Sequence, residues 1–294
     1  MGPWDSEEVK KDDVFRKQVF SNNIKSRACI GFWSDICGFG SLLEKSSWEL
    51  SKLNNNGDIQ LLRSFYDING RCLLPGTAPY PYDITMIVND GIAKTMDLSF
   101  TKQFDSYVIL LYIRDLFFSH VNFLRYHAIP KGVSLRSVLA GGEFIPYTVS
   151  SLTGNSVLQY DENNLSDYGK KILRTTYVYN PTEFQMNTAY AKAFTIEGMG
   201  SKSKIRKGYF YIEDSTLTVL NNAFKNFCKV EDDKIVFYYK RIPRMEFFIN
   251  NIISLKIKGL KVVIYEISKF HIYKELDGDD VVEDLLVINN GLEL

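Results

Sequence analysis

A short apolar segment that ends in an aspartate and runs at once into a glycine-rich turn is the feature that most limits the fold of this chain. The segment from Arg27 to Ser34 is apolar and aromatic, which is typical of a buried strand. Asp35 follows it, and Gly38-Phe39-Gly40 forms the turn. Ser41-Leu42-Leu43-Glu44 then has a capping-box pattern, which predicts a helix that starts there and continues to about Leu53. A strand, a turn and a helix start are therefore consecutive.

A second carboxylate, Asp90, stands at the tip of a predicted hairpin. Two runs of β-type residues, Asp83–Val88 and Ile92–Leu98, are joined by Asn89-Asp90-Gly91, which is a strong hairpin signal. Asp90 alone is explained by the hairpin, because Asp-Gly is the default sequence of a tight turn. Asp35 alone is explained in the same way, as a helix cap or a turn residue. Each residue by itself leaves both a structural and a functional interpretation open.

The two carboxylates point to one chemistry when they are taken together with the turn. A hairpin tip that carries Asp90, beside a strand that ends in Asp35, suits two metal ions about 3.5–4 Å apart that clamp the attacking and leaving oxygens of a phosphate displacement. The backbone N–H groups of the turn, at Phe39 and Gly40, could bind the phosphates. We therefore expect two Mg²⁺ or Mn²⁺ ions at this place, acting on a triphosphate.

Composition narrows the remaining function classes. The 294 residues are 45% apolar, so the chain can bury a substantial core. The 35 basic and 35 acidic residues cancel, so no global field favours nucleic acid or an anionic membrane.

The apolar run Val108–Ile113 is far shorter than the ~20 residues that cross a bilayer, and the charged first twenty residues lack the apolar core of a signal peptide. Scattered cysteines and histidines argue against zinc and a disulfide framework, so we expect a reduced, cytoplasmic protein without nucleic-acid or membrane partners.

The rest of the pattern predicts an α+β fold in three parts: a polar lead over residues 1–22, a main domain over 23–215 and a C-terminal extension over 216–294. The extension differs by its short strands rich in Lys, Phe, Tyr and Ile. The other predicted elements are a helix through Leu61–Tyr66, an amphipathic helix over Lys102–His127, a strand over Val133–Leu139 that ends in a turn at Gly141-Gly142, a helix over Thr188–Glu197, a basic turn over Gly200–Gly208 and a strand over Tyr209–Glu213.

These motifs, in this order, resemble the class III nucleotidyl cyclases, the catalytic domains of adenylate and guanylate cyclases. Phe32–Gly40 is similar to the first metal motif of that family and Asn89-Asp90-Gly91 to the second. The resemblance covers roughly residues 23–215. It implies a mostly antiparallel sheet with helices packed on it, and a homodimer whose two active sites are shared. It also implies that Asp35, the Ile36 carbonyl and Asp90 bind the two metal ions, while Asn187 of the other protomer orients the ribose.

The departures from the family pattern concern the base and the transition state. Adenylate cyclases bind the adenine ring through a lysine and an aspartate. The matching positions in this chain are Met86 and, approximately, Asn180. Neither supplies a charged contact to a purine. The family's arginine position is Ala191. Transition-state charge would then be met by a neighbouring or later basic residue, for which the candidates are Lys192, Lys202, Lys204 and Arg206; the basic turn is otherwise explained as a solvated surface.

A class III core without purine contacts looks like the bacterial pyrimidine nucleotide cyclases of the Pycsar anti-phage systems. That resemblance implies conversion of UTP or CTP to the 3′,5′-cyclic monophosphate and pyrophosphate, with cUMP slightly preferred over cCMP, and a cyclic product that acts on a separate effector. Two alternatives stay open. One is a catalytically degenerate, cyclase-like dimer that binds nucleotide as a regulatory module, and the other is a purine cyclase with unfamiliar base contacts.

Overall fold

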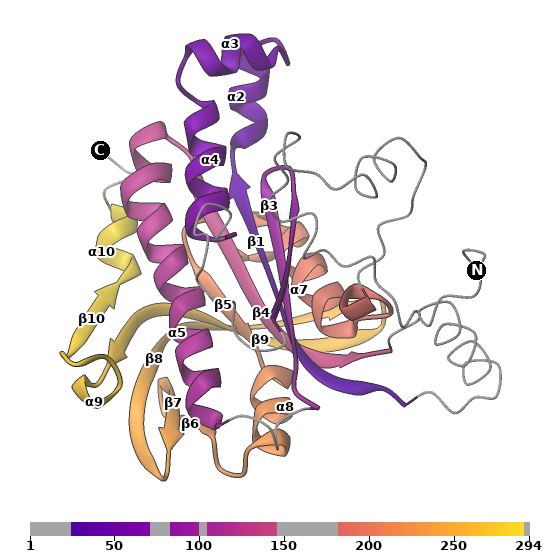
Figure 1. The fold of residues 1–294 in the computed structure, drawn as a ribbon, viewed down its shortest axis with the longest axis vertical. Coiled ribbons are helices and arrows are strands. Elements are labelled where there is room, and N and C mark those ends of the chain that lie inside the picture. Colours follow the sequence, from indigo (N-terminus) through magenta and orange to yellow (C-terminus); the bar gives the residue numbers. More distant parts are fainter. Residues whose placement is uncertain (1–24, 71–82, 100–104, 146–181, 291–294) are drawn as a thin grey trace, which may run out of the picture. The chain divides into compact units, whose positions relative to one another are not determined.

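The computed structural model describes residues 25–70, 83–99, 105–145 and 182–290 (Figure 1). The chain falls into two compact units. One unit comprises residues 1–27 and 143–187, and its described part includes the short 3₁₀ turn η6 (Thr182–Phe184). The other comprises residues 28–142 and 188–294 and holds nearly all of the described sheet and helices. The polar lead predicted over residues 1–22 lies outside the described residues.

A single ten-stranded sheet organises the larger unit. Its strand order is β2-β3-β1-β4-β5-β9-β8-β7-β6, with β10 paired to β9. The pair β4–β5 is parallel, whereas β1–β3, β2–β3, β5–β9 and the pairs beyond them are antiparallel. The expected α+β fold with a mostly antiparallel sheet is therefore confirmed. The strands are β1 (Arg27–Cys37), β2 (Asp83–Val88), β3 (Gly91–Asp97), β4 (Ser134–Phe144), β5 (Phe210–Glu213), β6 (Cys228–Glu231), β7 (Lys234–Tyr239), β8 (Ile242–Ile257), β9 (Leu260–Ile272) and β10 (Val281–Asp284).

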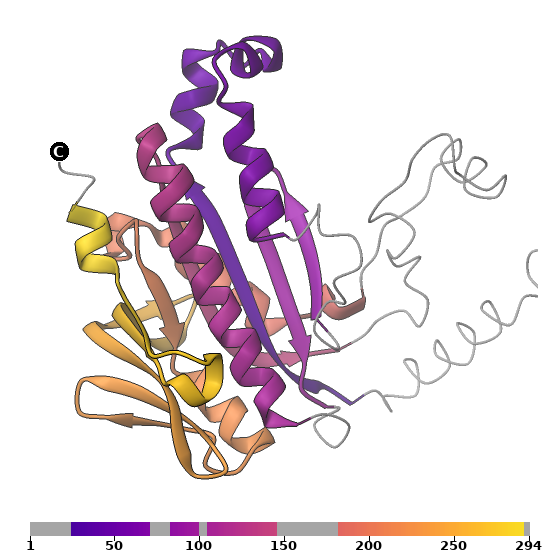
Figure 2. The same ribbon diagram turned by 60° about the vertical axis from the view of Figure 1, so that its left-hand side comes forward.

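Helices α4 and α5 cover one face of this sheet and α7 covers the other (Figures 1 and 2). The long helix α5 confirms the amphipathic helix predicted from the sequence, and it continues into a π-helical turn, η2 (Leu124–Ala128). The helices are α2 (Phe39–Lys45), α3 (Leu50–Asn55), α4 (Ile59–Ile68), α5 (Ser106–Phe123), α7 (Thr188–Met199), α8 (Ser215–Ala223), α9 (Lys274–Asp277) and α10 (Leu285–Asn290), with short 3₁₀ turns at η3 (Ile129–Lys131) and η7 (Ser201–Ser203).

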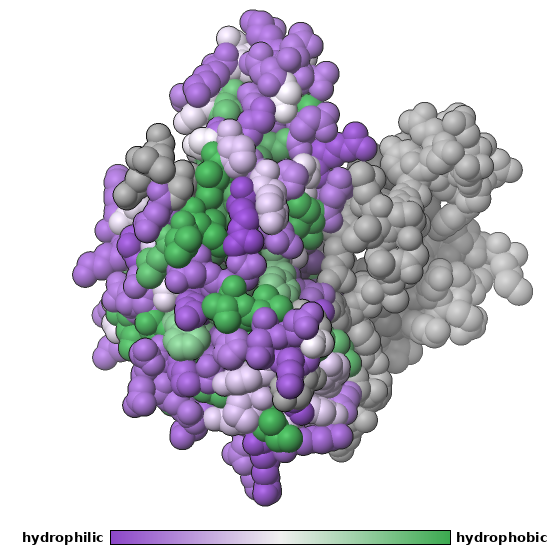
Figure 3. All heavy atoms as spheres, turned by 90° about the vertical axis from the view of Figure 1, so that its left-hand side faces the viewer, coloured by the Kyte–Doolittle hydropathy of each residue, from purple (hydrophilic) through white to green (hydrophobic). Residues whose placement is uncertain are grey.

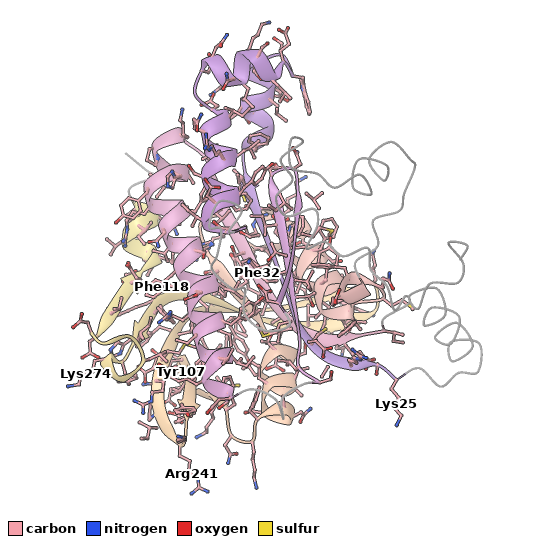
Figure 4. The ribbon with its side chains drawn as sticks, in the orientation of Figure 1. Lys25, Phe32, Tyr107, Phe118, Arg241 and Lys274 are labelled. Carbon is pink, nitrogen blue, oxygen red and sulfur yellow. The ribbon has the colours of Figure 1, made fainter. Side chains whose placement is uncertain are left out.

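Aromatic side chains fill the layer between α5 and the sheet. Phe117 of α5 packs its ring against Phe210, Phe247 and Phe270 of three neighbouring strands. Phe32 of β1 stacks on Phe210 and lies between α5 and the sheet (Figure 4). Since successive side chains of a strand point to opposite faces, the residues that alternate with Phe32 face α7 instead. Asp35 is one of them.

Two glycines let α7 approach the opposite face closely. A Cβ atom on Gly31 of β1 would stand 2.5 Å from the backbone nitrogen of Tyr190, and one on Gly142 of β4 would stand 2.6 Å from that of Ala189. Larger residues at either position would push the helix away from the sheet. The sequence prediction of a turn at Gly141-Gly142 is wrong, because both glycines lie inside β4. Gly142 allows the approach of α7, whereas a Cβ atom on Gly141 would stand 2.3 Å from the backbone oxygen of Ser215 in α8.

The helix that follows the first strand is shorter than predicted. α2 begins at Phe39, directly after Gly38, which has φ = 99°, and no side chain caps it. Ser41 therefore lies inside the helix rather than at its cap. The chain breaks again at Ser47 and Trp48, which both have positive φ values, before α3 begins at Leu50. The predicted continuous helix to about Leu53 is replaced by two short ones.

The strands after residue 215 extend the same sheet. β5 lies before this point and β9 after it, and the two strands pair through four residues from Phe210↔Ile267 to Glu213↔Ile264. β8 and β9 form the longest strand pair of the described sheet, and β7 joins them. Tyr107 at the start of α5 packs on Tyr239 of β7, with ring centroids 5.3 Å apart (Figure 4). The division proposed near residue 215 thus falls between strands that pair with each other.

One described segment, Ser106–Lys131, is long and apolar enough to cross a membrane by length and composition alone. Of its most apolar window, 56% is buried inside the protein, where α5 packs on the sheet. Elsewhere, apolar side chains reach the surface in several separate patches, as seen from the side of α10 and β10 (Figure 3). Val282 and Val287 of these elements are exposed.

A buried histidine links α5 to the centre of the sheet. His120 is fully buried, and its Nδ1 lies 2.8 Å from Oγ of Ser137 in β4. Ser137 Oγ in turn lies 2.8 Å from Oγ of Ser34 in β1. Burial lowers the pKa of His120 from its ordinary value to about 3. The ring is therefore neutral in the folded protein at neutral pH.

This histidine predicts acid destabilisation with a defined sign. Below its ordinary pKa of about 6.5 the unfolded chain binds a proton at His120 that the folded protein does not, so the free energy of unfolding falls as the pH falls. At pH ~5 the loss from this one residue amounts to about 2 kcal/mol. We expect His120→Gln to be less stable than the wild type at neutral pH but to lose less stability between pH ~7 and ~5. Urea unfolding at both pH values measures the difference, and equal losses in the two proteins would contradict the prediction.

Candidate functional site

Asp35 and Asp90 meet at one end of the sheet. Asp35 is the ninth residue of β1 and pairs with Gly91, the first residue of β3. Asp90 occupies the two-residue turn between β2 and β3, and its carbonyl oxygen accepts a hydrogen bond from the backbone N–H of Ile36 at 3.1 Å. The predicted hairpin is confirmed, and β-pairing brings the two aspartates together although they are 55 positions apart in the chain.

Trp33 fixes the position of the turn that carries Asp90. Its ring packs on Tyr190 and Phe194 of α7, with centroid separations of 6.1 and 5.1 Å. A Cβ atom on Gly91 would lie only 2.4 Å from the Trp33 ring and 3.3 Å from Oδ1 of Asp35. Gly91 is therefore required by close packing, as well as by the sequence preference of the turn. No pattern in the sequence indicated this role for Trp33, because it depends on the position of α7.

A buried ion pair stands beside Asp35. Arg136 of β4 binds Glu197 of α7, with Nη1 donating to Oε1 at 2.5 Å and to the backbone carbonyl at 3.1 Å. Burial, followed by the charges of Glu197 and Asp90, raises the pKa of Asp35 to about 7, although the Arg136 guanidinium acts in the opposite direction. Burial also raises the pKa of Asp90, against the hydrogen bond from Asn89. The site gathers more negative than positive charge in a poorly solvated place.

This donor set suits a hard divalent cation. Oxygen ligands from carboxylates and backbone carbonyls are those that Mg²⁺ and Mn²⁺ prefer, and a bound cation would offset the charge that raises the pKa of Asp35. Among the described residues, no group of three or more His, Cys, Asp and Glu side chains is arranged to hold a metal ion. A site of two carboxylates and a carbonyl would therefore need oxygens from the substrate or solvent to complete the coordination.

The turn after β1 contributes backbone rather than side chains. Phe39 is buried in the core, so only its backbone could contact a substrate. Gly40 is exposed, and a Cβ atom added there would meet nothing within 4 Å. Ile36 is buried as a side chain, which leaves its carbonyl as the predicted ligand. The roles of these residues remain predictions.

Met86 shares the sheet face of Trp33 and Asp35. It pairs with Ala93 of β3, and Ala93 pairs with Trp33 of β1, so the three side chains stand in a row across the sheet. The neutral Met86 thus lies on the α7 face, two residues along each strand from the Asp35 end. Asn180, the second position predicted to contact the base, lies outside the described residues.

Two of the predicted cations are already paired within the protein. Lys192 of α7 binds Glu213 at 3.2 Å and also contacts Oγ of Ser215. Arg206 forms a bidentate ion pair with Glu266 of β9, and the Glu266 side chain is fully buried. A role in stabilising a transition state would require either cation to leave its carboxylate or to act from that position.

The other basic residues of the turn after α7 are exposed. Lys202 lies in η7 and Lys204 follows it with φ = 67°, and neither forms an ion pair with a residue in the described ranges. Lys207 is the member of this turn whose charge acts on Cys37, at the end of β1 two residues beyond Asp35. The sequence pattern marked the turn as basic, but it did not single out Lys207.

Asn187 belongs to the smaller unit and directly precedes α7. Its Nδ2 donates a hydrogen bond to the carbonyl of Glu183 at 2.8 Å. Its role in orienting a ribose remains a prediction.

Comparison with known proteins gave matches among solved structures alone. No family model and no curated protein matched the chain. The structure of the guanylyl cyclase Cya2 is similar with a TM-score of 0.44 and 13% identity, over 83% of this chain and 93% of that one. A bacterial light-regulated adenylyl cyclase is similar with a TM-score of 0.43 and 13% identity, over 97% of this chain and 66% of that one.

The contact between Gly91 and Trp33 predicts a sensitive position. Gly91→Ala places a methyl group against a ring that Tyr190 and Phe194 hold from the other side, so the turn carrying Asp90 must shift. We expect a loss of about 1–3 kcal/mol in the free energy of unfolding, measured by urea denaturation. The matched control is Gly198→Ala in α7, where a Cβ atom meets nothing within 4 Å and helix propensity predicts a gain of up to about 1 kcal/mol. Equal effects of the two substitutions would contradict this packing.

Proposed function

We propose that this protein is a nucleotidyl cyclase that converts a pyrimidine nucleoside triphosphate to its 3′,5′-cyclic monophosphate and pyrophosphate. The observation that carries the proposal is the meeting of Asp35 and Asp90 at one end of the sheet, with the glycine-rich turn directly beyond β1. Their order along the chain resembles the metal motifs of class III cyclases. An in-line displacement at phosphorus that uses two metal ions requires carboxylates that hold both ions at one place.

Two Mg²⁺ or Mn²⁺ ions would be held by Asp35, the carbonyl of Ile36 and Asp90. When bound, they would supply activation of the ribose 3′-hydroxyl and neutralisation of the triphosphate charge. The chain's own part is to concentrate negative charge there, at a place where burial raises the pKa of both aspartates. Lys202, Lys204 and Lys207 are exposed on the turn after α7 and would contact the phosphates. Asn187 of a second protomer would orient the ribose in a shared active site.

Met86 supports a pyrimidine rather than a purine. Its thioether lies on the same sheet face as Asp35, at the position where adenylate cyclases carry a lysine for adenine. A methionine there offers apolar surface and only a weak acceptor, so it gives no charged contact to the larger base. UTP and CTP are the substrates we propose, with UTP slightly preferred. The cyclic product would act on a separate effector, as in anti-phage signalling.

An assay with each of the four nucleoside triphosphates and Mn²⁺ tests the proposal. We expect cyclic UMP or cyclic CMP, identified by mass, and at least a hundredfold loss of rate in Asp35→Asn and in Asp90→Asn, because each removes a metal-binding charge. Asp58→Asn is the matched control, since Asp58 pairs with Lys131 on the surface at 2.9 Å. It should keep the wild-type rate.

Purine products alone would overturn the choice of substrate. Unchanged rates in the two active-site variants would overturn the mechanism as a whole.

The paired cations favour a second candidate function, a dimeric module that binds nucleotide without converting it. Ala191 occupies the family's arginine position, and Lys192 and Arg206 are engaged with Glu213 and Glu266. Nucleotide binding in calorimetry, with no product in the assay above, would favour this candidate. Retention of both aspartates favours the enzyme, because a binding module has no need of the pair.

A further inference from the structure

Arg136 and Glu197 form a buried ion pair that ties the last turns of α7 to β4. Their side chains are only 10% and 9% exposed. Nη1 of Arg136 bonds both the Glu197 carboxylate and its backbone carbonyl, so the guanidinium holds the helix and the side chain together. Burying two charges is favourable only when they are well paired, which makes this pair costly to break on one side.

The pair and Asp35 share one sheet face. β1 and β4 are neighbours, and the hydrogen bond between Ser34 and Ser137 shows that these two serines lie opposite each other on the α5 face. Neighbouring residues of a strand point to opposite faces. Asp35, which follows Ser34, and Arg136, which precedes Ser137, therefore both face α7. Their charges, with that of Glu197, act on one another in this position.

Arg136 also has hydrogen-bonding capacity left over. Its Nε is buried and makes no hydrogen bond to any residue of the described ranges. A guanidinium has five N–H donors and pairs strongly with carboxylates. If Glu197 did not hold it, Arg136 would have Asp35 as the carboxylate beside it, and that pairing would compete directly with a metal ion.

We propose that Glu197 is a positioning residue. It holds the guanidinium of Arg136 against α7, so that the Asp35 carboxylate can bind a divalent cation instead of pairing with Arg136. The inference rests on the proposed function, because it assumes that Asp35 is a metal ligand. The charges of Asp90, Glu197 and Arg136 all act on Asp35, so this cluster of three carboxylates and one guanidinium carries two net negative charges when all are ionised. Neutralising Glu197 lowers this charge and releases Arg136 toward Asp35, and both effects weaken cation binding.

The test is Mn²⁺ binding to the full-length protein, with the metal alone, followed by calorimetry at a fixed pH above neutrality. Glu197→Gln should weaken Mn²⁺ binding by at least about tenfold. The double variant Arg136→Gln with Glu197→Gln should bind Mn²⁺ more tightly than Glu197→Gln, because the competing cation is gone. Glu283→Gln is the matched control, since it breaks the Arg125–Glu283 ion pair between η2 and β10 and should leave Mn²⁺ affinity unchanged.

Each outcome decides the inference. Wild-type affinity in Glu197→Gln overturns it, because Arg136 then does not compete for Asp35. Equal weakness in the single and double variants also overturns it, because Glu197 would then act on the metal directly. If Glu197→Gln fails to fold, Arg136→Gln alone must bind Mn²⁺ at least as tightly as the wild type, and weaker binding overturns the inference. Absence of Mn²⁺ binding in the wild type instead contradicts the metal centre of the proposed function.

Discussion

Concentrated negative charge at one end of a buried sheet is the constraint on which the rest of this structure depends. Asp35 and Asp90 are brought together by the pairing of β1 with β3, and burial raises the pKa of both carboxyl groups. A protein does not hold such charge without compensation. Arg136 supplies part of it, and it is itself bound to Glu197. The unbalanced remainder is what a divalent cation would neutralise, and this connects the packing of the site to its proposed chemistry.

The packing around the site is organised to keep α7 close to the sheet. Gly31 and Gly142 allow the helix backbone to approach β1 and β4, and Trp33 fills the space between α7 and the turn before β3. This approach brings Glu197 within reach of Arg136. On the opposite face, α5 rests on the aromatic layer around Phe117. Because both helices pack on the strand that carries Asp35, we expect substitutions on either sheet face to affect the position of the aspartates.

Local patterns in the sequence predicted the elements that local interactions determine. The hairpin at Asn89-Asp90-Gly91 and the long amphipathic helix are examples, because turn chemistry and helical periodicity specify them without the rest of the fold. The position of Arg136 and Glu197 beside Asp35 could not be predicted in that way, because it depends on which strands become neighbours. The turn expected at Gly141-Gly142 failed for a related reason: glycine also marks close approach of another backbone, and the sequence does not distinguish the two uses. The capping box at Ser41 failed because Gly38 begins the helix earlier.

The proposed chemistry requires that Asp35 and Asp90 bind divalent cations together. Anomalous diffraction from crystals grown with Mn²⁺ and a non-hydrolysable pyrimidine nucleoside triphosphate tests it most directly, because manganese scatters anomalously and its position is seen without any assumption about catalysis. We expect manganese peaks within coordination distance of both carboxylates, with the triphosphate oxygens completing the shell. A nucleotide bound at this end of the sheet with no manganese at Asp35 and Asp90 would contradict it.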